Sequence, residues 1–111
     1  MSVTVNKYDH VAVLTSKEDI NRETVEQFKS AAEKCLDEGI NSFVVDCASM
    51  SAIDSAGLEA LLDLQDKCED SLGSVKLCAL DETLAKVLEI TRLVRRFEVF
   101  ADMDAAVKSF T

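Results

Sequence analysis

Residues 45–58 read Val-Asp-Cys-Ala-Ser-Met-Ser-Ala-Ile-Asp-Ser-Ala-Gly-Leu. The apolar run at residues 42–47, Ser-Phe-Val-Val-Asp-Cys, is typical of a buried strand. From Ser55 onward, one stripe at helical spacing carries Leu58, Leu61, Leu62, Gln65 and Cys68. The stretch therefore predicts a buried strand, a connecting loop, and a helix that begins at Ser55.

The segments on both sides of this stretch show the same alternation between strand and helix periods. Strands are expected at residues 3–7, 11–15, 42–47, 75–79 and 97–100. Helices are expected at residues 23–38, from 55 to shortly before Gly73, at 82–90, and after a capping Asp102, with Gly39 ending the first of them. The order β-β-α-β-α-β-α-β-α predicts a single α/β domain, a mostly parallel mixed sheet of about five strands with about four helices. The first strand is expected to run antiparallel at or near an edge.

Length and charge restrict the classes of function. The 111 residues suit one domain, which we expect to span residues 1–111. The 21 acidic and 12 basic residues give a formal net charge of −9, which disfavours binding to nucleic acid or to a membrane surface. A basic protein patch suits this charge better, although solubility explains the charge equally well. Because no basic leader with an apolar run and no membrane-length apolar segment occurs, a cytoplasmic location is expected.

The cysteines and the single histidine argue against a metal site, a cofactor and an enzyme. Four widely spaced cysteines without a C-x-x-C motif suggest buried free thiols: Cys35, Cys47, Cys68 and Cys78. A serine hydrolase needs a base within reach of its nucleophile, and His10 lies in a predicted turn far along the chain from Ser55. With three scattered glycines, the chain also has no glycine-rich phosphate loop.

The sheet type directs attention to the loop before Ser55. In parallel sheets the functional surface lies at the carboxyl ends of the strands. Here the loop ends in Asp54-Ser55-Ala56-Gly57, where Ser55 is predicted to be the helix N-cap. Gly57 is predicted to leave the backbone open to an approach from outside, and a helix N-terminus stabilises an anion. Taken alone, these four residues favour a simple helix cap over a functional site.

The wider context resembles the STAS domain, and in particular the stand-alone anti-sigma-factor antagonists. The most specific part is Ile-Asp-Ser-Ala-Gly-Leu at residues 53–58, after a strand that ends in Val-Val-Asp and before a leucine-striped helix. The opening hairpin, the helix with Thr-Val-Glu-Gln-Phe at 24–28, the strand with Val-Lys-Leu at 75–77 and the segment Leu-Val-Arg-Arg-Phe at 93–97 extend the likeness over nearly the whole chain.

The resemblance implies a binding module that is switched by phosphorylation and is not an enzyme. The serine of the family's Asp-Ser-x-Gly motif is phosphorylated, and it matches Ser55. The implied kinase is an anti-sigma factor with a serine-kinase fold, and a phosphatase removes the phosphate. The unphosphorylated antagonist binds the anti-sigma factor and so frees the sigma factor for transcription. The expected partner-binding residues are Asn21, Asp54, Ser55, Ala56, Gly57 and Leu58.

One departure from the family pattern affects the loop before the first helix. The family often carries Gly-Glu-Leu-Asp after the second strand, and its Asp lies near the phosphorylated serine. Asn21 takes that position here, with Asp19 two residues earlier. An N-cap for the first helix explains Asn21 at least as well.

Two other interpretations stay open. The chain could be a STAS scaffold or regulatory subunit of a sensory or transport complex, in which Ser55 is a fixed contact. It could also be an interaction domain without a switch. In that case Arg92, Arg95 and Arg96 would anchor an acidic partner or, as we favour, offset charge at the end of the third helix.

Overall fold

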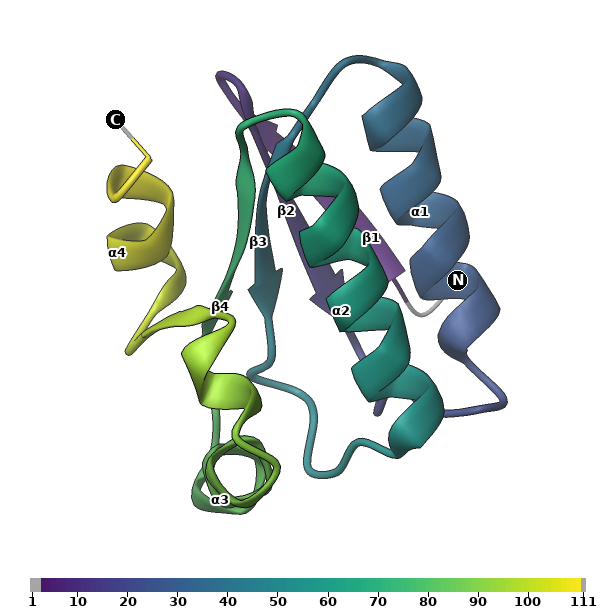
Figure 1. Cartoon of the computed structure of the whole chain (residues 1–111), viewed down its shortest axis with the longest axis vertical. Coiled ribbons are helices and arrows are strands. Elements are labelled where there is room, and N and C mark those ends of the chain that lie inside the picture. Colours follow the sequence, from purple (N-terminus) through teal and green to yellow (C-terminus); the bar gives the residue numbers. More distant parts are fainter. Residues whose placement is uncertain (1–2, 111) are drawn as a thin grey trace.

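The computed structural model of the chain describes residues 3–110. A central sheet is flanked by helices on both faces (Figure 1). In chain order the elements are β1 (Val3–Tyr8), β2 (Val11–Ser16), α1 (Val25–Asp37), β3 (Ser42–Asp46), α2 (Ser55–Asp70), β4 (Ser74–Cys78), α3 (Glu82–Ile90), the 3-10 helix η1 (Leu93–Arg95), β5 (Glu98–Phe100) and α4 (Met103–Lys108). The predicted fold class and order of elements are confirmed.

The five strands lie in the sheet in the order in which they occur along the chain, β1-β2-β3-β4-β5. β1 pairs antiparallel with β2, and every later neighbour is parallel. The prediction of an antiparallel first strand at the sheet edge is therefore correct. Because β2, β3 and β4 run in parallel, the loops before α1, α2 and α3 all leave the sheet at its carboxyl edge.

Alternating side chains of the strands build two separate cores. Ala12 and Leu14 of β2 belong to the larger core, on the face that α1 and α2 cover. Val11 and Val13 point to the smaller core, beneath Ala106 of the short helix α4. This two-residue period is what a strand covered on both faces requires. Figure 1 shows α1 and α2 side by side in front of the sheet, with α4 beyond β4.

The helix ends follow the capping residues expected from the sequence. Gly39 has a φ of +87° and its amide donates to the Leu36 carbonyl, while the Ile40 amide donates to that of Cys35. This is the left-handed turn that glycine favours after a helix. Asp102 caps α4 by accepting a bond from the Ala105 amide at 2.9 Å. α1 begins two residues later than expected, because residues 21–24 form a separate turn.

Candidate functional site

Helix α2 begins with an aspartate cap. Asp54 has extended backbone angles, and its Oδ1 accepts a hydrogen bond from the Gly57 amide at 3.0 Å. Ser55 is the first residue inside the helix, so the prediction that Ser55 is the N-cap is wrong. Both residue types cap well. The carboxylate takes the position here because its second oxygen also finds a donor, in the neighbouring loop.

That second bond is part of a reciprocal link between the loops before α1 and α2. Asp54 Oδ2 accepts from the Arg22 amide at 3.0 Å. In return, Asp19 Oδ1 accepts from the Ser51 and Ala52 amides, at 2.7 and 3.1 Å. Each loop therefore supplies a carboxylate to backbone donors of the other, which fixes the two loops together.

A backbone bridge reinforces the link. Ile20 and Ile53 form an isolated parallel bridge between the two loops, and Ile20 is buried. The bridge adds a short extension of pairing beyond the ends of β2 and β3. The start of α2 is therefore held by tertiary structure as well as by its own cap.

The hydrogen bonds of Asp54 also affect its charge. The Gly57 amide lowers the pKa of the Asp54 carboxyl most, and the Arg22 amide lowers it further. Donors that favour the charged form of a carboxyl group lower its pKa. Asp54 is therefore a fixed negative charge directly beside Ser55 at neutral pH.

Gly57 is buried against the chain itself. A Cβ at this position would lie 2.3 Å from the Ile20 carbonyl oxygen and 2.6 Å from Ile53 Cγ1. The prediction that Gly57 leaves the backbone open to an outside partner is wrong, because the loop before α1 already makes that close approach. The glycine is needed for the junction of the two loops.

Asn21 serves the turn that leads into α1. Its Oδ1 accepts from the Glu23 amide at 2.9 Å and from the Thr24 amide at 3.2 Å. Thr24, the residue before α1, makes no side-chain cap bond to the helix. The interpretation of Asn21 as the N-cap of the first helix is therefore wrong, because Asn21 closes a separate turn and Thr24 precedes α1.

The Ser55 side chain is exposed. Among residues 3–110, no partner for its hydroxyl is found. Ala56 and Leu58, the neighbouring predicted contact residues, are half-buried, and Asp54 is exposed. The chain thus presents a free hydroxyl on a rigid helix start.

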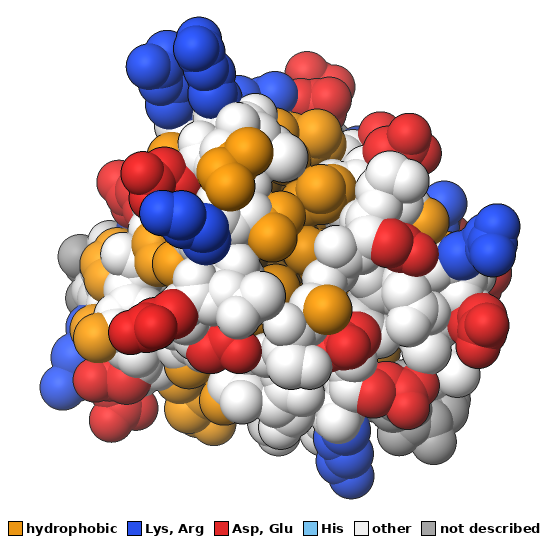
Figure 2. Space-filling model, turned by 90° about the horizontal axis from the view of Figure 1, so that it is seen from below, with side chains coloured by type: hydrophobic (Ala, Val, Ile, Leu, Met, Phe, Trp, Pro, Cys, Tyr) orange, Lys and Arg blue, Asp and Glu red, His pale blue; other side chains and the backbone are white. Residues whose placement is uncertain are grey.

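An apolar hollow lies on the same side of the molecule. Figure 2 shows hydrophobic side chains along its middle, between regions that carry charged side chains. At the carboxyl edge of the sheet, a small cavity has an entirely apolar lining from the loop before α2, α2, β4, the segment after β4 and α3: Cys47, Met50, Ile53, Leu61, Leu77, Leu80, Leu84 and Leu88. Such a hollow beside a rigid, exposed hydroxyl suits contact with another protein.

Three residues that hold the site together had no predicted role: Asp19, Ile20 and Arg22. A signal was present in the pairs Asp19-Ile20 and Ile53-Asp54. Each places an isoleucine next to an aspartate in the loop before a helix. The partners of these residues, however, are set by the distance between loops, which the pattern does not contain.

The geometry separates Ser55 from the single histidine. His10 lies in the turn between β1 and β2, at the amino end of β2, whereas Ser55 follows the carboxyl end of the parallel strands (Figure 1). The length of β2, roughly 16 Å, lies between these two edges. A serine–histidine pair is therefore not formed. Within residues 3–110, no group of three histidine, cysteine or acidic side chains could hold a metal ion.

The four cysteines are free and buried, as expected from the sequence. Burial raises the pKa of Cys68 to about 11 and the pKa values of Cys47 and Cys78 to about 12. Burial also raises the pKa of Cys35. Since thiolates are the reactive form, these thiols are poor nucleophiles at neutral pH.

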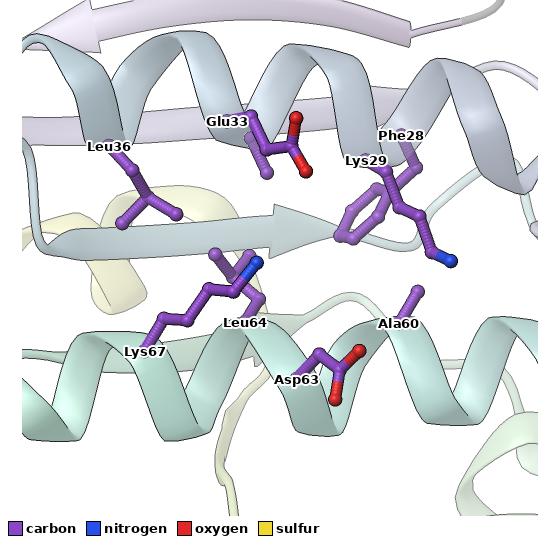
Figure 3. Close-up of a pocket in the computed structure, with 9 residues that line it drawn as sticks. Phe28, Lys29, Glu33, Leu36, Ala60, Asp63, Leu64 and Lys67 are labelled. Carbon is purple, nitrogen blue, oxygen red and sulfur yellow. The ribbon is translucent and has the colours of Figure 1, made fainter.

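A second hollow, between α1 and α2, is too small for a ligand site. Its volume is about 120 Å³, below the ~300 Å³ of typical small-molecule pockets. Figure 3 shows Lys29 and Glu33 of α1 facing Asp63 and Lys67 of α2 across an apolar floor. The charges balance, which suits a solvated seam between two helices.

The sequence and fold agree with a known family. The STAS domain family model matches residues 2–106, and the chain belongs to this family. No curated protein sequence matches the chain.

Solved structures show the same fold at low sequence identity. An anti-sigma factor antagonist from Mycobacterium paratuberculosis is 20% identical with a TM-score of 0.85, over 96% of this chain and 91% of the other. The Bacillus cell fate determinant SpoIIAA in its phosphorylated form is 17% identical with a TM-score of 0.78, over 98% and 99%. A sulfate transporter family protein from Wolinella succinogenes is 18% identical with a TM-score of 0.81, over 94% and 87%.

Among the described residues, no helix has both the length and the apolar character needed to cross a membrane.

Proposed function

We propose that this chain is an anti-sigma-factor antagonist whose binding is switched by phosphorylation of Ser55. Unphosphorylated, it binds an anti-sigma factor of the serine-kinase fold, and phosphorylation releases it. The observation that carries the proposal is the exposed Ser55 hydroxyl, which has no partner within residues 3–110 and lies on a helix start fixed by the neighbouring loop. The likeness to anti-sigma factor antagonists supports the proposal; one of them, SpoIIAA, is solved in both its unphosphorylated and its phosphorylated form.

The switch works through local charge. Phosphate adds about −1.5 to −2 charges to Ser55, beside the carboxylate of Asp54. The helix N-terminus tolerates this anion in the free protein. A partner docked over Ser55 would have to bury it, and an unpaired buried charge costs several kcal/mol. A loss of even ~3 kcal/mol weakens binding by more than a hundredfold.

Asn21, Asp54, Ala56, Gly57 and Leu58 have different roles around that hydroxyl in this proposal. Asp54 and Gly57 fix the helix start, as does the turn around Asn21. Ala56 and Leu58, both half-buried, supply apolar contact beside Ser55. A phosphatase that acts on phospho-Ser55 resets the switch.

The test pairs the chain with kinase-fold anti-sigma factors of its own organism. We expect ATP and the correct partner to add one phosphate to the wild type, localised to Ser55 by peptide mass spectrometry, and none to Ser55→Ala. By calorimetry, Ser55→Asp should bind the partner at least about a hundredfold more weakly than Ser55→Ala. Ser30→Asp places the same charge on the exposed side of α1 and serves as the control, with binding close to wild type.

Phosphate on another residue, or equal binding by Ser55→Asp and Ser55→Ala, contradicts the proposal.

A second candidate is a STAS subunit of a transport or sensory complex that has no switch. The likeness to the sulfate transporter family protein favours it. In that case, the chain would bind its partner with Ser55 unmodified. After incubation with ATP and every candidate kinase, the wild type and Ser55→Ala would bind the partner with equal affinity.

A further inference from the structure

A second surface feature lies where α3 ends, and we call it the arginine patch: Ile90, Arg92, Val94 and Arg95. The side chains of Ile90 and Val94 are exposed, at 71% and 43% relative accessibility. Arg92 and Arg95 are exposed as well. Large apolar side chains next to arginines are typical of the centres of protein interfaces.

The two arginines of the patch differ from their neighbour Arg96. Arg96 donates to Asp66 Oδ1 at 2.7 Å and to Glu69 Oε1 at 3.2 Å, both on α2. In the part of the chain that the structure describes, the side chains of Arg92 and Arg95 have no ion pair. In a chain with 21 acidic residues, these two guanidinium groups are left without a carboxylate. Arg96 thus offsets charge on α2, and not at the end of the third helix as the sequence suggested.

The backbone beneath the patch is held in place. Arg92 adopts a left-handed conformation with a φ of 63°, which costs about 1 kcal/mol or more for a residue other than glycine. Such a conformation persists where the surroundings fix it. The Arg96 carbonyl accepts from the buried Gln65 side chain, and Gln65 Oε1 accepts from the Val75 amide at 2.7 Å. The patch is thus anchored to both α2 and the sheet.

The patch also continues the apolar hollow towards Ser55. Leu58, Leu62 and Asp66 are four residues apart on α2 and share one face. Because Asp66 contacts Arg96, this face of the helix runs from the start of α2 towards η1. Leu93 of η1 is half-buried and packs against the main core. In Figure 2, basic side chains stand at one end of the apolar strip.

We propose that the arginine patch and the adjoining strip of α2 dock an amphipathic helical segment of a partner protein, whose apolar row fills the hollow and whose carboxylates pair with Arg92 and Arg95. Arginine binds carboxylates through two parallel hydrogen bonds, which fixes the direction of the segment. A bilayer fits less well, because anionic membranes are recognised by clusters of four to eight basic residues, and this chain has a net charge of −9. At its Ser55 end, the docked segment would share Leu58 with the proposed anti-sigma-factor contact.

Two designed 18-residue helical peptides test the proposal on the full chain. Both peptides carry the same row of leucines. The polar face carries glutamates in the first peptide and lysines in the second. The overall charge of the protein favours the lysine peptide, whereas the arginine patch favours the glutamate peptide. We expect the glutamate peptide to shift the amide signals of residues 88–96 and of Leu58 and Leu62 in NMR spectra of the labelled protein.

Charge reversal provides the matched comparison. Arg92→Glu/Arg95→Glu should weaken binding of the glutamate peptide by about tenfold or more. Lys34→Glu/Lys67→Glu makes the same change in net charge at exposed sites on α1 and α2. This variant should weaken binding of the glutamate peptide by less than about threefold. All four side chains are exposed, and urea unfolding of each variant shows that it is folded under the conditions of the binding assay. Val94→Ser should also weaken binding, without a change in charge.

Three results would overturn the inference. The first is binding of the lysine peptide at residues 88–96, and the second is equal binding of the glutamate peptide by both charge-reversal variants. The third is co-sedimentation with phosphatidylglycerol vesicles that requires Arg92 and Arg95, together with no binding of the glutamate peptide, since this would make the patch a membrane contact.

Discussion

The starts of α2 and α4 use the same local device and differ in what surrounds it. Asp54 and Asp102 both accept a hydrogen bond from the amide three residues later. Within residues 3–110, Asp102 has no bond to another loop, whereas Asp54 also accepts from the Arg22 amide. The start of α4 is therefore a cap alone, and the start of α2 is a cap built into a junction between two loops. Such rigidity favours binding at the proposed Ser55 surface, because a rigid site loses little conformational entropy on binding.

The largest expected effect comes from the residue three positions after each cap. In an exposed helix, alanine is about 1 kcal/mol more favourable than glycine. Gly57→Ala should nevertheless lower the free energy of unfolding by about 3 kcal/mol, because its Cβ would meet the Ile20 carbonyl. Ala105→Gly, at the equivalent position of α4, should cost about 1 kcal/mol. Urea unfolding monitored by circular dichroism measures both, and a stabilised Gly57→Ala variant would show that the loops do not meet as described.

The contrast between the two helix starts also marks what the sequence allowed us to predict. The order of elements, the range of α3 and the caps at Gly39 and Asp102 follow from local patterns, because periodicity and capping depend on near neighbours. The cap of α2 was assigned to Ser55 instead of Asp54 because both residues cap well, and a donor 32 positions away decides between them.

The role of Gly57 was misread for the same reason. Its missing side chain is required by a carbonyl from the loop before α1, at a distance that no local pattern encodes. The exposure of Ser55, in contrast, follows from its place at a helix start on the carboxyl edge of the sheet, and this could be predicted.

A smaller effect on stability is expected when each capping aspartate is replaced by asparagine. Asparagine caps helices as well as aspartate does, so Asp102→Asn should leave the urea midpoint close to wild type. Asp54→Asn keeps one acceptor for the Gly57 amide but turns an N–H group towards the Arg22 amide, which leaves that donor unpaired. We therefore expect a clear fall in the midpoint for Asp54→Asn, measured at pH 7.

The difference in stability between the wild type and Asp54→Asn should depend on pH. Because the pKa of Asp54 is lowered in the folded state, its charge stabilises the fold above the ordinary carboxyl pKa. This stabilisation is lost as the pH falls below about 4 and through the lowered value. The difference in urea midpoint between the wild type and Asp54→Asn should therefore become smaller as the pH falls from 5 to about 2. A gap that widens on acidification would contradict the assigned hydrogen bonds.

The smallest effect is expected at Ser55, and its size decides what the hydroxyl is for. Thr24 and Ser55 both lie at helix starts, but Thr24 Oγ1 donates to the Asp19 carbonyl at 2.7 Å and accepts from the Asn21 amide at 3.0 Å. Thr24→Ala should cost about 1 kcal/mol, while Ser55→Ala should change the free energy of unfolding by less than about 0.5 kcal/mol. If Ser55→Ala proves as costly as Thr24→Ala, the hydroxyl contributes to the fold. A neutral result, in contrast, means that folding does not require the hydroxyl at this rigid helix start, which leaves it free for modification or contact.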